Sequence, residues 1–267
     1  MKLNIVPAST GAAWVKLGIT TFFKQPLALG GLFFMSIAIT QILAIVPFIG
    51  IVVAMVIFPA TTLGMMVATL QAVQGKFAMP KVLLSAFQAG KERTSAMLKL
   101  GVMYATGLLV VVTLVALMDG GELAKELAKS PVPSPAIMDS PDFLSTILVG
   151  MGLYSFLSVL FWHAPALVHW HSVTPAKAVF FSFVACMRNW RAYTVYALTW
   201  TAVFIVGATL VSALAALLGL GQGAGLVLLP LILMMVTMFV CSIYFTFRDS
   251  FSHAEPDSDL TAAPPTE

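Results

Sequence analysis

Long stretches without charged side chains dominate this chain. No Asp, Glu, Lys or Arg occurs in residues 25–75, 100–118, 143–176 and 192–247. A helix needs about 20 predominantly apolar residues to cross the hydrocarbon core of a bilayer. The first and last stretches are each long enough for two such helices, and the other two for one each. The pattern therefore predicts six transmembrane helices, at about residues 27–46, 48–71, 100–117, 144–168, 193–218 and 226–247.

Each pair of predicted spans follows a polar stretch with the pattern of an amphipathic helix that lies in the membrane interface. These surface helices are expected at about residues 14–24, 80–92 and 175–191. Their polar faces carry Lys16, Thr20 and Lys24, then Lys81, Ser85, Gln88 and Glu92, then Lys177, Arg188 and Arg191. The predicted fold class is all-α, a polytopic membrane helical bundle. Because identity between the three units is slight, a true threefold repeat of surface helix plus helix pair stays open.

Composition agrees with a membrane protein, and the positive residues set its orientation. Only 9% of the residues are charged and 60% are hydrophobic, whereas soluble domains carry about 25% charged residues. Of the 14 Lys and Arg residues, only Lys125 and Lys129 fall on one side of the predicted membrane. The positive-inside rule then places both termini in the cytoplasm, in a multi-pass protein of the inner membrane. Cys186 and Cys241 lie in or near the cytoplasmic half, where no disulfide is expected.

The remaining segments are expected outside the bilayer. Residues 1–247 form a single membrane domain in this prediction, with one sizeable periplasmic loop at 118–143. In that loop Asp119 and Glu122 have the spacing of a helix capping box. Regular structure is then broken by Pro131, Pro133, Pro135 and Pro141. Residues 248–267, rich in Asp, Pro and Ala, are expected to form a disordered cytoplasmic tail.

Small residues recur at four-residue spacing within several spans. They are Ala60, Gly64 and Ala68, then Gly101 and Ala105, then Ala208, Ser212 and Ala216. Small side chains let two helix backbones approach closely in lipid. These stripes are therefore expected to pack spans within the chain or to join two copies of it as a homo-oligomer.

Three histidines lie together in the run FWHAPALVHWH, where the fourth predicted span ends. His169 and His171 would share one side of an extended segment, and a helix unwound after His163 would bring all three together. Histidine is the commonest metal-binding side chain, so a metal site is one interpretation. However, zinc takes three or four protein ligands, and no carboxylate or cysteine lies close in sequence. The alternative is an interfacial belt of histidine and tryptophan rings at the level of the lipid headgroups.

Polar side chains inside the predicted spans are candidates for ligand binding, because such groups are costly to keep in lipid. The candidates are His163, Gln41 and Thr61. Alternatively, His163 is a neutral side chain that hydrogen-bonds a neighbouring span near Tyr154, Ser158 or Thr61. Interhelical hydrogen bonding also accounts for Gln41 and Thr61.

Basic side chains beside the spans are expected to contact anionic lipid headgroups, at about 1 kcal/mol each. They are Lys16, Lys24, Lys81, Lys91, Arg93, Lys177, Arg188 and Arg191. The alternative is that they only set the topology. Because they are spread among membrane-flanking segments and not gathered in one domain, nucleic-acid binding is not supported.

Several segments resemble known membrane families. The start MKLNIVPASTGAAWVKLG, the segment FFKQPLALGGLFF and the run FWHAPALVHWH are similar to an uncharacterised family of proteobacterial inner-membrane proteins. That likeness covers most of the chain apart from the periplasmic loop and the tail. It implies an inner-membrane protein and no established activity. The stretch APALVHWHSVTPAKAVFFSFVACMRNW more distantly resembles a joint in the membrane domain attached to some glycerophosphodiester phosphodiesterases. That enzymatic function does not carry over, because the chain contains no soluble phosphodiesterase domain.

Three functions fit this pattern. The first is transport or handling of a lipid-like or weakly polar small molecule in a cavity of the bundle, reached by His163 or Gln41. The second is a non-catalytic membrane scaffold or envelope-stress protein, which a dry, closed bundle would favour. The third is a metal-binding membrane enzyme that uses the histidine trio, although the nearest acid/base carboxylates would lie across the bilayer. We expect no enzymatic activity and no cofactor, with membrane lipids as partners.

Overall fold

The computed structural model describes residues 2–47, 49–129, 134–140, 142–219 and 224–252. Six stretches of the described chain are helical, long and apolar enough to cross a membrane. They consist of α2 (Pro26–Ala44), α3 (Ile49–Val73), α5 (Lys91–Met118), α8 (Phe143–Phe161) with α9 (Ala164–His171), α11 (Trp190–Leu217) and α12 (Ala224–Ser250). The predicted all-α fold class with six candidate spans is confirmed.

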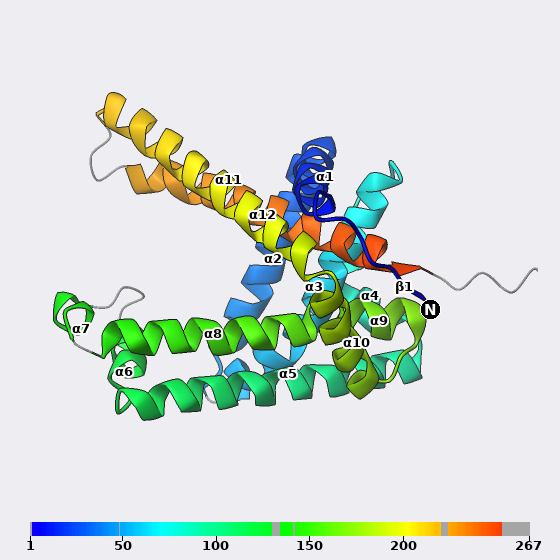
Figure 1. Ribbon diagram of the computed structural model, residues 1–267, viewed down its shortest axis with the longest axis horizontal. Helices are drawn as coiled ribbons and strands as arrows, with labels where there is room; N and C mark the ends of the chain where they lie inside the picture. Colours follow the sequence, from blue (N-terminus) through cyan, green and yellow to red (C-terminus); the bar gives the residue numbers. More distant parts are fainter. Residues whose placement is uncertain (1, 48, 130–133, 141, 220–223, 253–267) are drawn as a thin grey trace, which may run out of the picture.

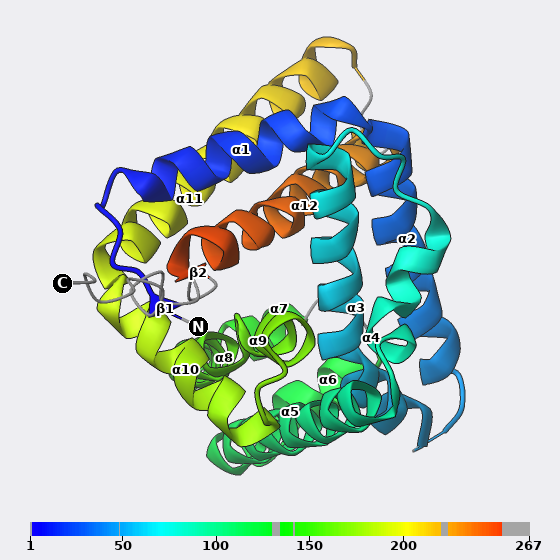
Figure 2. The ribbon, with the colours of Figure 1, turned by 90° about the vertical axis from the view of Figure 1, so that its right-hand side faces the viewer.

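The long helices form three hairpins, α2–α3, α5–α8 and α11–α12, whose members lie side by side. In Figure 1, α5–α8 and α11–α12 both extend toward the left. The loop helices α6 (Glu122–Lys129) and α7 (Pro135–Met138) lie at the far end of α5–α8. The α2–α3 hairpin runs across their direction and is seen upright in Figure 2. Helix α3 contacts both α5 and α12, so it joins the three hairpins at the centre.

The surface elements are α1 (Thr10–Lys24), the 3-10 helix η1 (Pro80–Leu84) with α4 (Ser85–Gln88), and α10 (Pro175–Arg188). Each of them packs mainly on a hairpin other than the one that it precedes in the chain, although α4 also contacts α5 and α1 also contacts α2 and α3. Helix α1 packs on α11 and α12, η1 and α4 pack on α3, and α10 packs on α8 and α9. The three units of surface helix plus hairpin are therefore interlocked in cyclic order.

Helix α1 buries one face in the protein. Trp14 and Phe22 are buried, whereas Lys16 and Lys24 are exposed. A Cβ on Gly18 would lie 2.8 Å from the carbonyl oxygen of Met238, so the backbones of α1 and α12 nearly touch there. The predicted two-sided helix is present, but its apolar face packs on α11 and α12 (Figure 2).

The second predicted surface helix is shorter than expected. It ends at Gln88, and Gly90 adopts a φ of 93° that favours glycine. Glu92 therefore belongs to α5 and does not continue the face of Lys81 and Ser85 as predicted. Helix α5 begins at Lys91, well before the predicted start near residue 100, because charged residues at the membrane boundary do not end a helix.

The fourth span is broken into α8 and α9 by a side chain from α10. The Ser182 hydroxyl accepts a hydrogen bond from the backbone N–H of His163 at 3.0 Å and donates one to the carbonyl of Val159 at 2.9 Å. In an unbroken helix those two backbone groups would bond directly. An inserted side chain is an established cause of a sharp helix kink.

The two ends of the described chain meet in a short antiparallel pair. Strand β1 (Lys2–Leu3) pairs with β2 (Phe251–Ser252). The expected disordered tail from residue 248 is therefore wrong for residues 248–252, because α12 continues to Ser250 and Phe251 is buried. The rest of the predicted tail, 253–267, lies outside the described residues, as do Pro131, Pro133 and Pro141.

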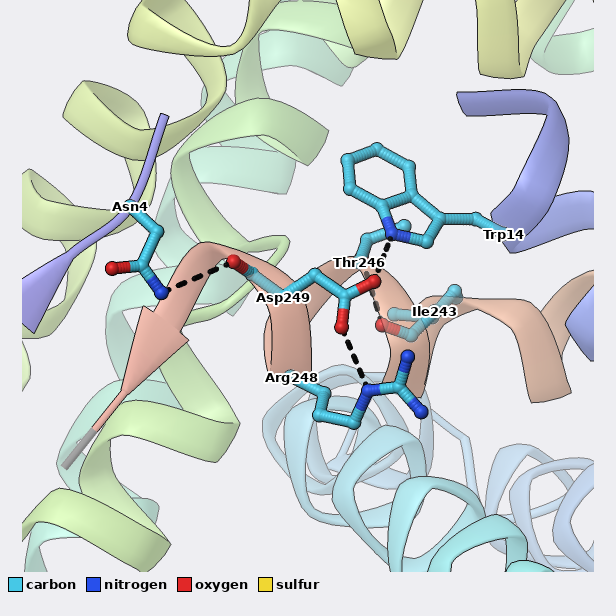
Figure 3. Close-up of polar contacts among 6 residues, drawn as sticks. All are labelled: Asn4, Trp14, Ile243, Thr246, Arg248 and Asp249. Carbon is cyan, nitrogen blue, oxygen red and sulfur yellow. Dashed lines mark hydrogen bonds and ion pairs between the residues drawn. The ribbon is translucent and has the colours of Figure 1, made fainter. Parts of the chain in front are cut away.

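Asp249 ties three segments together beside this pair (Figure 3). Its carboxylate accepts a 2.9 Å hydrogen bond from the indole N–H of Trp14 and forms a 2.7 Å ion pair with Arg248. The side-chain amide of Asn4 donates to its backbone carbonyl at 3.4 Å.

Asn189 holds the first residues of the chain against the start of α11. Its side-chain oxygen accepts from the backbone N–H of Val6 at 2.9 Å, and its side-chain N–H donates to the carbonyl of Asn4 at 3.0 Å. Asn189 is buried, so these bonds satisfy polar groups that water does not reach.

The small-residue stripes have different uses. Ala60, Gly64 and Ala68 are buried within the chain, and a Cβ on Gly64 would lie 2.8 Å from the Cα of Leu83. The stripe of Ala208, Ser212 and Ala216 is exposed. Only 11% of the most apolar part of α2 and of α11 is buried, so lipid tails are the natural cover for their outer faces.

Candidate functional site

A cavity of ≈ 220 Å³ lies where the three hairpins meet. Every hairpin contributes to its wall. The lining residues are Phe33, Ser36, Phe58, Pro59, Thr61, Thr62, Met65, Tyr104, Tyr154, Ser158, Phe161, Trp162, Pro165, Phe239, Val240 and Ile243. This volume is below the roughly 300–1,000 Å³ of pockets for drug-sized molecules. The cavity therefore suits a small molecule or one part of a longer chain.

Two prolines lie at the cavity and disturb the helices there. Pro59 stands inside α3, and Pro165 stands in the first turn of α9. A proline inside a helix removes one backbone hydrogen bond and pushes the backbone aside. Pro59 therefore interrupts the backbone hydrogen-bond ladder of α3 beside the cavity.

The polar groups of the wall are mostly hydroxyls that are bonded within their own helices. Ser36 donates to the carbonyl of Phe33 at 2.7 Å. Thr61 and Thr62 both donate to the carbonyl of Phe58, at 2.8 and 3.1 Å. Such hydroxyls can still accept a hydrogen bond from a ligand. The described residues that line the cavity include no carboxylate, lysine, arginine or histidine.

Aromatic rings form one side of the cavity. Phe58 of α3 stacks on Tyr104 of α5 with ring centroids 5.0 Å apart, and Tyr104 meets Phe161 edge-on at 5.3 Å. Phe58 and Tyr154 are 43% and 46% exposed, so both also face the exterior of the bundle between α3 and α8.

The three residues predicted to bind a ligand are not brought together. Thr61 lines the cavity, as do Tyr154 and Ser158, which were considered as partners for His163. Gln41 is exposed on α2 and is absent from the wall. His163 is fully buried behind Trp162 and does not line the cavity.

His163 has its own buried surroundings. Its Nε2 atom lies 2.5 Å from the hydroxyl of Tyr193, and its ring packs edge-on against Phe251 at 5.4 Å. Its Nδ1 atom is buried and has no hydrogen-bond partner among the residues that the structure describes. Burial raises the pKa of the nearby Cys186 thiol to about 12, so this group stays neutral at physiological pH. The alternative interpretation, a histidine hydrogen-bonded to a neighbouring span, matches this arrangement with Tyr193 as the partner.

The predicted metal site is not assembled. Among the described residues, no group of three or more His, Cys, Asp or Glu side chains is placed to hold a metal ion. His169 packs against Trp170 with ring centroids 5.8 Å apart, and His171 packs against Phe247 at 5.9 Å. Since His163 bonds to Tyr193, the three histidines serve separate contacts in this structure.

The basic residues expected at lipid headgroups are exposed. This holds for Lys16, Lys24, Lys81, Lys91, Arg93, Lys177, Arg188 and Arg191. In the described part of the chain none of them takes part in an ion pair. Their charges therefore remain available to anions outside the protein.

One relative matches nearly the whole chain. A protein of Burkholderia thailandensis with the name "probable inner membrane protein" is 35% identical over 259 residues, which is 96% of each chain. This chain belongs to the same family. It is a multi-pass inner-membrane protein, in agreement with its six candidate spans.

The other comparisons add no family. No family model matches the chain, and no solved structure matches it. The distant resemblance to the membrane domain attached to glycerophosphodiester phosphodiesterases therefore has no support. The orientation with both termini in the cytoplasm stays a prediction.

Sequence reasoning missed the centre of the cavity. Phe58, Tyr104, Phe161 and Phe239 come from four helices, and nothing in their spacing links them. The available signal was the pair of prolines, Pro59 and Pro165, both of which line the cavity.

Proposed function

We propose that this inner-membrane protein binds a lipid-like or weakly polar small molecule in the cavity between its three hairpins. The observation that carries the proposal is the composition of the wall, which is aromatic and aliphatic with a few hydroxyls and no ionic side chain. Such a wall favours an apolar ligand with one or two hydrogen-bonding groups. The exposed rings of Phe58 and Tyr154 form the rim through which the molecule enters sideways from the bilayer.

Binding, with or without release on the other side of the membrane, is proposed in preference to catalysis. A general acid or base must lie within hydrogen-bond reach of the reacting group. In the part of the wall that the structure describes, the hydroxyls of the cavity have neither a histidine nor a carboxylate among their neighbours.

The proposal is tested by filling the cavity. Ser158→Phe adds a ring to the wall, and Ser155→Phe adds the same ring to an exposed position of α8 outside it. Overpacking costs about 1–3 kcal/mol, or about 5- to 150-fold in affinity. Native mass spectrometry of the detergent-extracted proteins should show a co-purified molecule in wild type and Ser155→Phe, depleted by that factor in Ser158→Phe. Equal retention by both variants, or an empty wild-type protein, would refute the proposal.

A scaffold role is the second candidate, because the stripe of Ala208, Ser212 and Ala216 is exposed on α11. A partner span or a second copy of the chain could pack closely there. Size-exclusion chromatography with light scattering would measure the oligomeric state. The candidate predicts an oligomer in wild type that Ser212→Leu dissociates, and a monomer in both would exclude a homo-oligomer through this stripe.

A further inference from the structure

An open cleft of ≈ 610 Å³ lies between the first turns of α5 and the loop that joins α9 to α10. It is separate from the central cavity and shares no lining residue with it. Helix α5 contacts both α9 and α10, which fixes the two walls of the cleft relative to each other (Figure 2).

The wall formed by α5 is strongly basic. Among the described residues that line the cleft, Lys91, Arg93 and Lys99 stand against one carboxylate, that of Glu92. In the described part of the chain none of these three cations forms an ion pair. Cations gathered at one place without partners favour an anionic ligand.

The opposite wall offers hydrogen-bond donors. Ser172 and Thr174 line it, and both are exposed. Ser172 has a left-handed backbone with a φ of 53°. Thr174 precedes the first turn of α10 and makes no side-chain capping bond, so its hydroxyl is not engaged with that helix. The positive end of the α10 dipole points the same way, which adds to the attraction for an anion.

The cleft continues onto an open, shallow surface along one face of α5, which we call the groove, and all of its described lining residues belong to that helix. This groove shares Lys91, Ser95 and Lys99 with the cleft. It then runs over side chains of the membrane-spanning part of α5, namely Leu98, Val102 and Met103, which are 42%, 54% and 38% exposed. A ligand that occupies both must be anionic at one end and apolar at the other.

We propose that the cleft binds the phosphate of an anionic glycerophospholipid, whose acyl chain lies along the groove on α5. Arg93 and the two lysines contact the phosphate oxygens, and the hydroxyls of Ser172 and Thr174 donate to the remaining oxygens. A free phosphate ester has the same headgroup chemistry but no chain for the groove. The groove therefore favours the lipid.

The test compares two triple variants in full-length protein. In the first, Lys91, Arg93 and Lys99 are replaced by Gln. In the matched control, Gln replaces Lys2, Lys76 and Lys125, three exposed cations that line neither the cleft nor the groove and are not among the residues expected at lipid headgroups. Binding of phosphatidylglycerol and of phosphatidylcholine is measured by native mass spectrometry in mixed micelles. We expect wild type and control to prefer phosphatidylglycerol, and the cleft variant to bind it about a hundredfold more weakly.

Three outcomes would overturn the proposal. Equal losses in the two triple variants would mean that only the overall charge matters. Equal binding of both lipids by wild type would remove the anionic specificity. Displacement of bound phosphatidylglycerol by millimolar inorganic phosphate or glycerol 3-phosphate would mean that the acyl chain contributes nothing and that the site takes a soluble phosphate.

Discussion

The hydroxyl of Ser182 takes the place of a backbone hydrogen bond in another helix. It lies between the N–H of His163 and the carbonyl of Val159, and it bonds to both. The side chain that breaks α8 from α9 also satisfies the groups that the break exposes. This matters inside a membrane protein, where an unsatisfied backbone group is expensive.

Replacing Ser182 by Ala should destabilise the protein by about 1–3 kcal/mol, the cost of a buried polar group without its partner. The control is Ser145→Ala, which removes an exposed hydroxyl that bonds only within its own helix and should cost under about 0.5 kcal/mol. Thermal unfolding in detergent, followed by circular dichroism, measures both. If Ser182→Ala is as stable as wild type, the helix has closed the direct bond and the serine is not required for the break.

Individual contacts could be predicted only in part from the sequence. The polar residues inside the spans were identified correctly as unusual, but their partners were not. His163 bonds to Tyr193 because α11 returns beside the broken fourth span, a tertiary fact with no local signal. For the metal interpretation, no group of three possible ligands is assembled among the described residues, where each histidine ring meets an aromatic or phenolic neighbour.

The surface helices act as connectors between hairpins in this structure. Helix α1 has the exposed lysines that were predicted, but its other face packs against α11 and α12. Glycines make this close approach workable, since a side chain at Gly18 would meet the backbone of α12. Packing within the protein, more than burial in lipid, therefore determines where α1 lies.

Gly18→Ala should weaken the contact between α1 and α12, because its Cβ would lie 2.5 Å from the Cβ of Ser242. Overpacking of this kind costs about 1–3 kcal/mol. Gly31→Ala is the matched control in α2, where an added Cβ meets nothing within 4 Å. That change should be neutral or slightly stabilising, since alanine favours helix more than glycine does. The melting temperatures of the two variants test this prediction. Equal melting temperatures would show that α1 is not tightly packed.

Long apolar helices could be predicted from the sequence because the thickness of the bilayer requires uncharged, apolar runs of about 20 residues. The ends of these helices could not be predicted. Helix α5 continues through the charged residues before 100, and the fourth span is interrupted by a side chain more than ten residues beyond it in the sequence. Both departures arise from contacts made by other elements.

The three units of surface helix and hairpin close into a ring through the chain ends. Asn189 bonds the backbone of Asn4 and Val6, and Asp249 bonds Trp14, so the last unit holds the first. The order of the hairpins around this ring follows from long-range pairing. No alternation of polar and apolar residues along a single chain encodes it, which is why the number of spans was predictable and their arrangement was not.

Asn189→Ala should release the first residues of the chain from the start of α11, because both backbone groups lose their partners. Asn189→Asp keeps the acceptor for Val6 but cannot donate to Asn4, so its effect should be similar in kind. Limited proteolysis with mass-spectrometric mapping should show faster cleavage before residue 10 in both variants. Wild-type resistance in both would mean that the β1–β2 pair alone holds the N-terminal segment.

The pairing of β1 with β2 has a consequence for connectivity. Lys2 lies opposite Ser252 in antiparallel register, so the second strand ends where the first begins. A two-residue turn of the kind found in tight hairpins could join them. A covalently closed version could then be reopened elsewhere, for instance in the exposed turn at Gly75, with the helices left in place. The position of the chain ends could then be changed by circular permutation without a change in the fold.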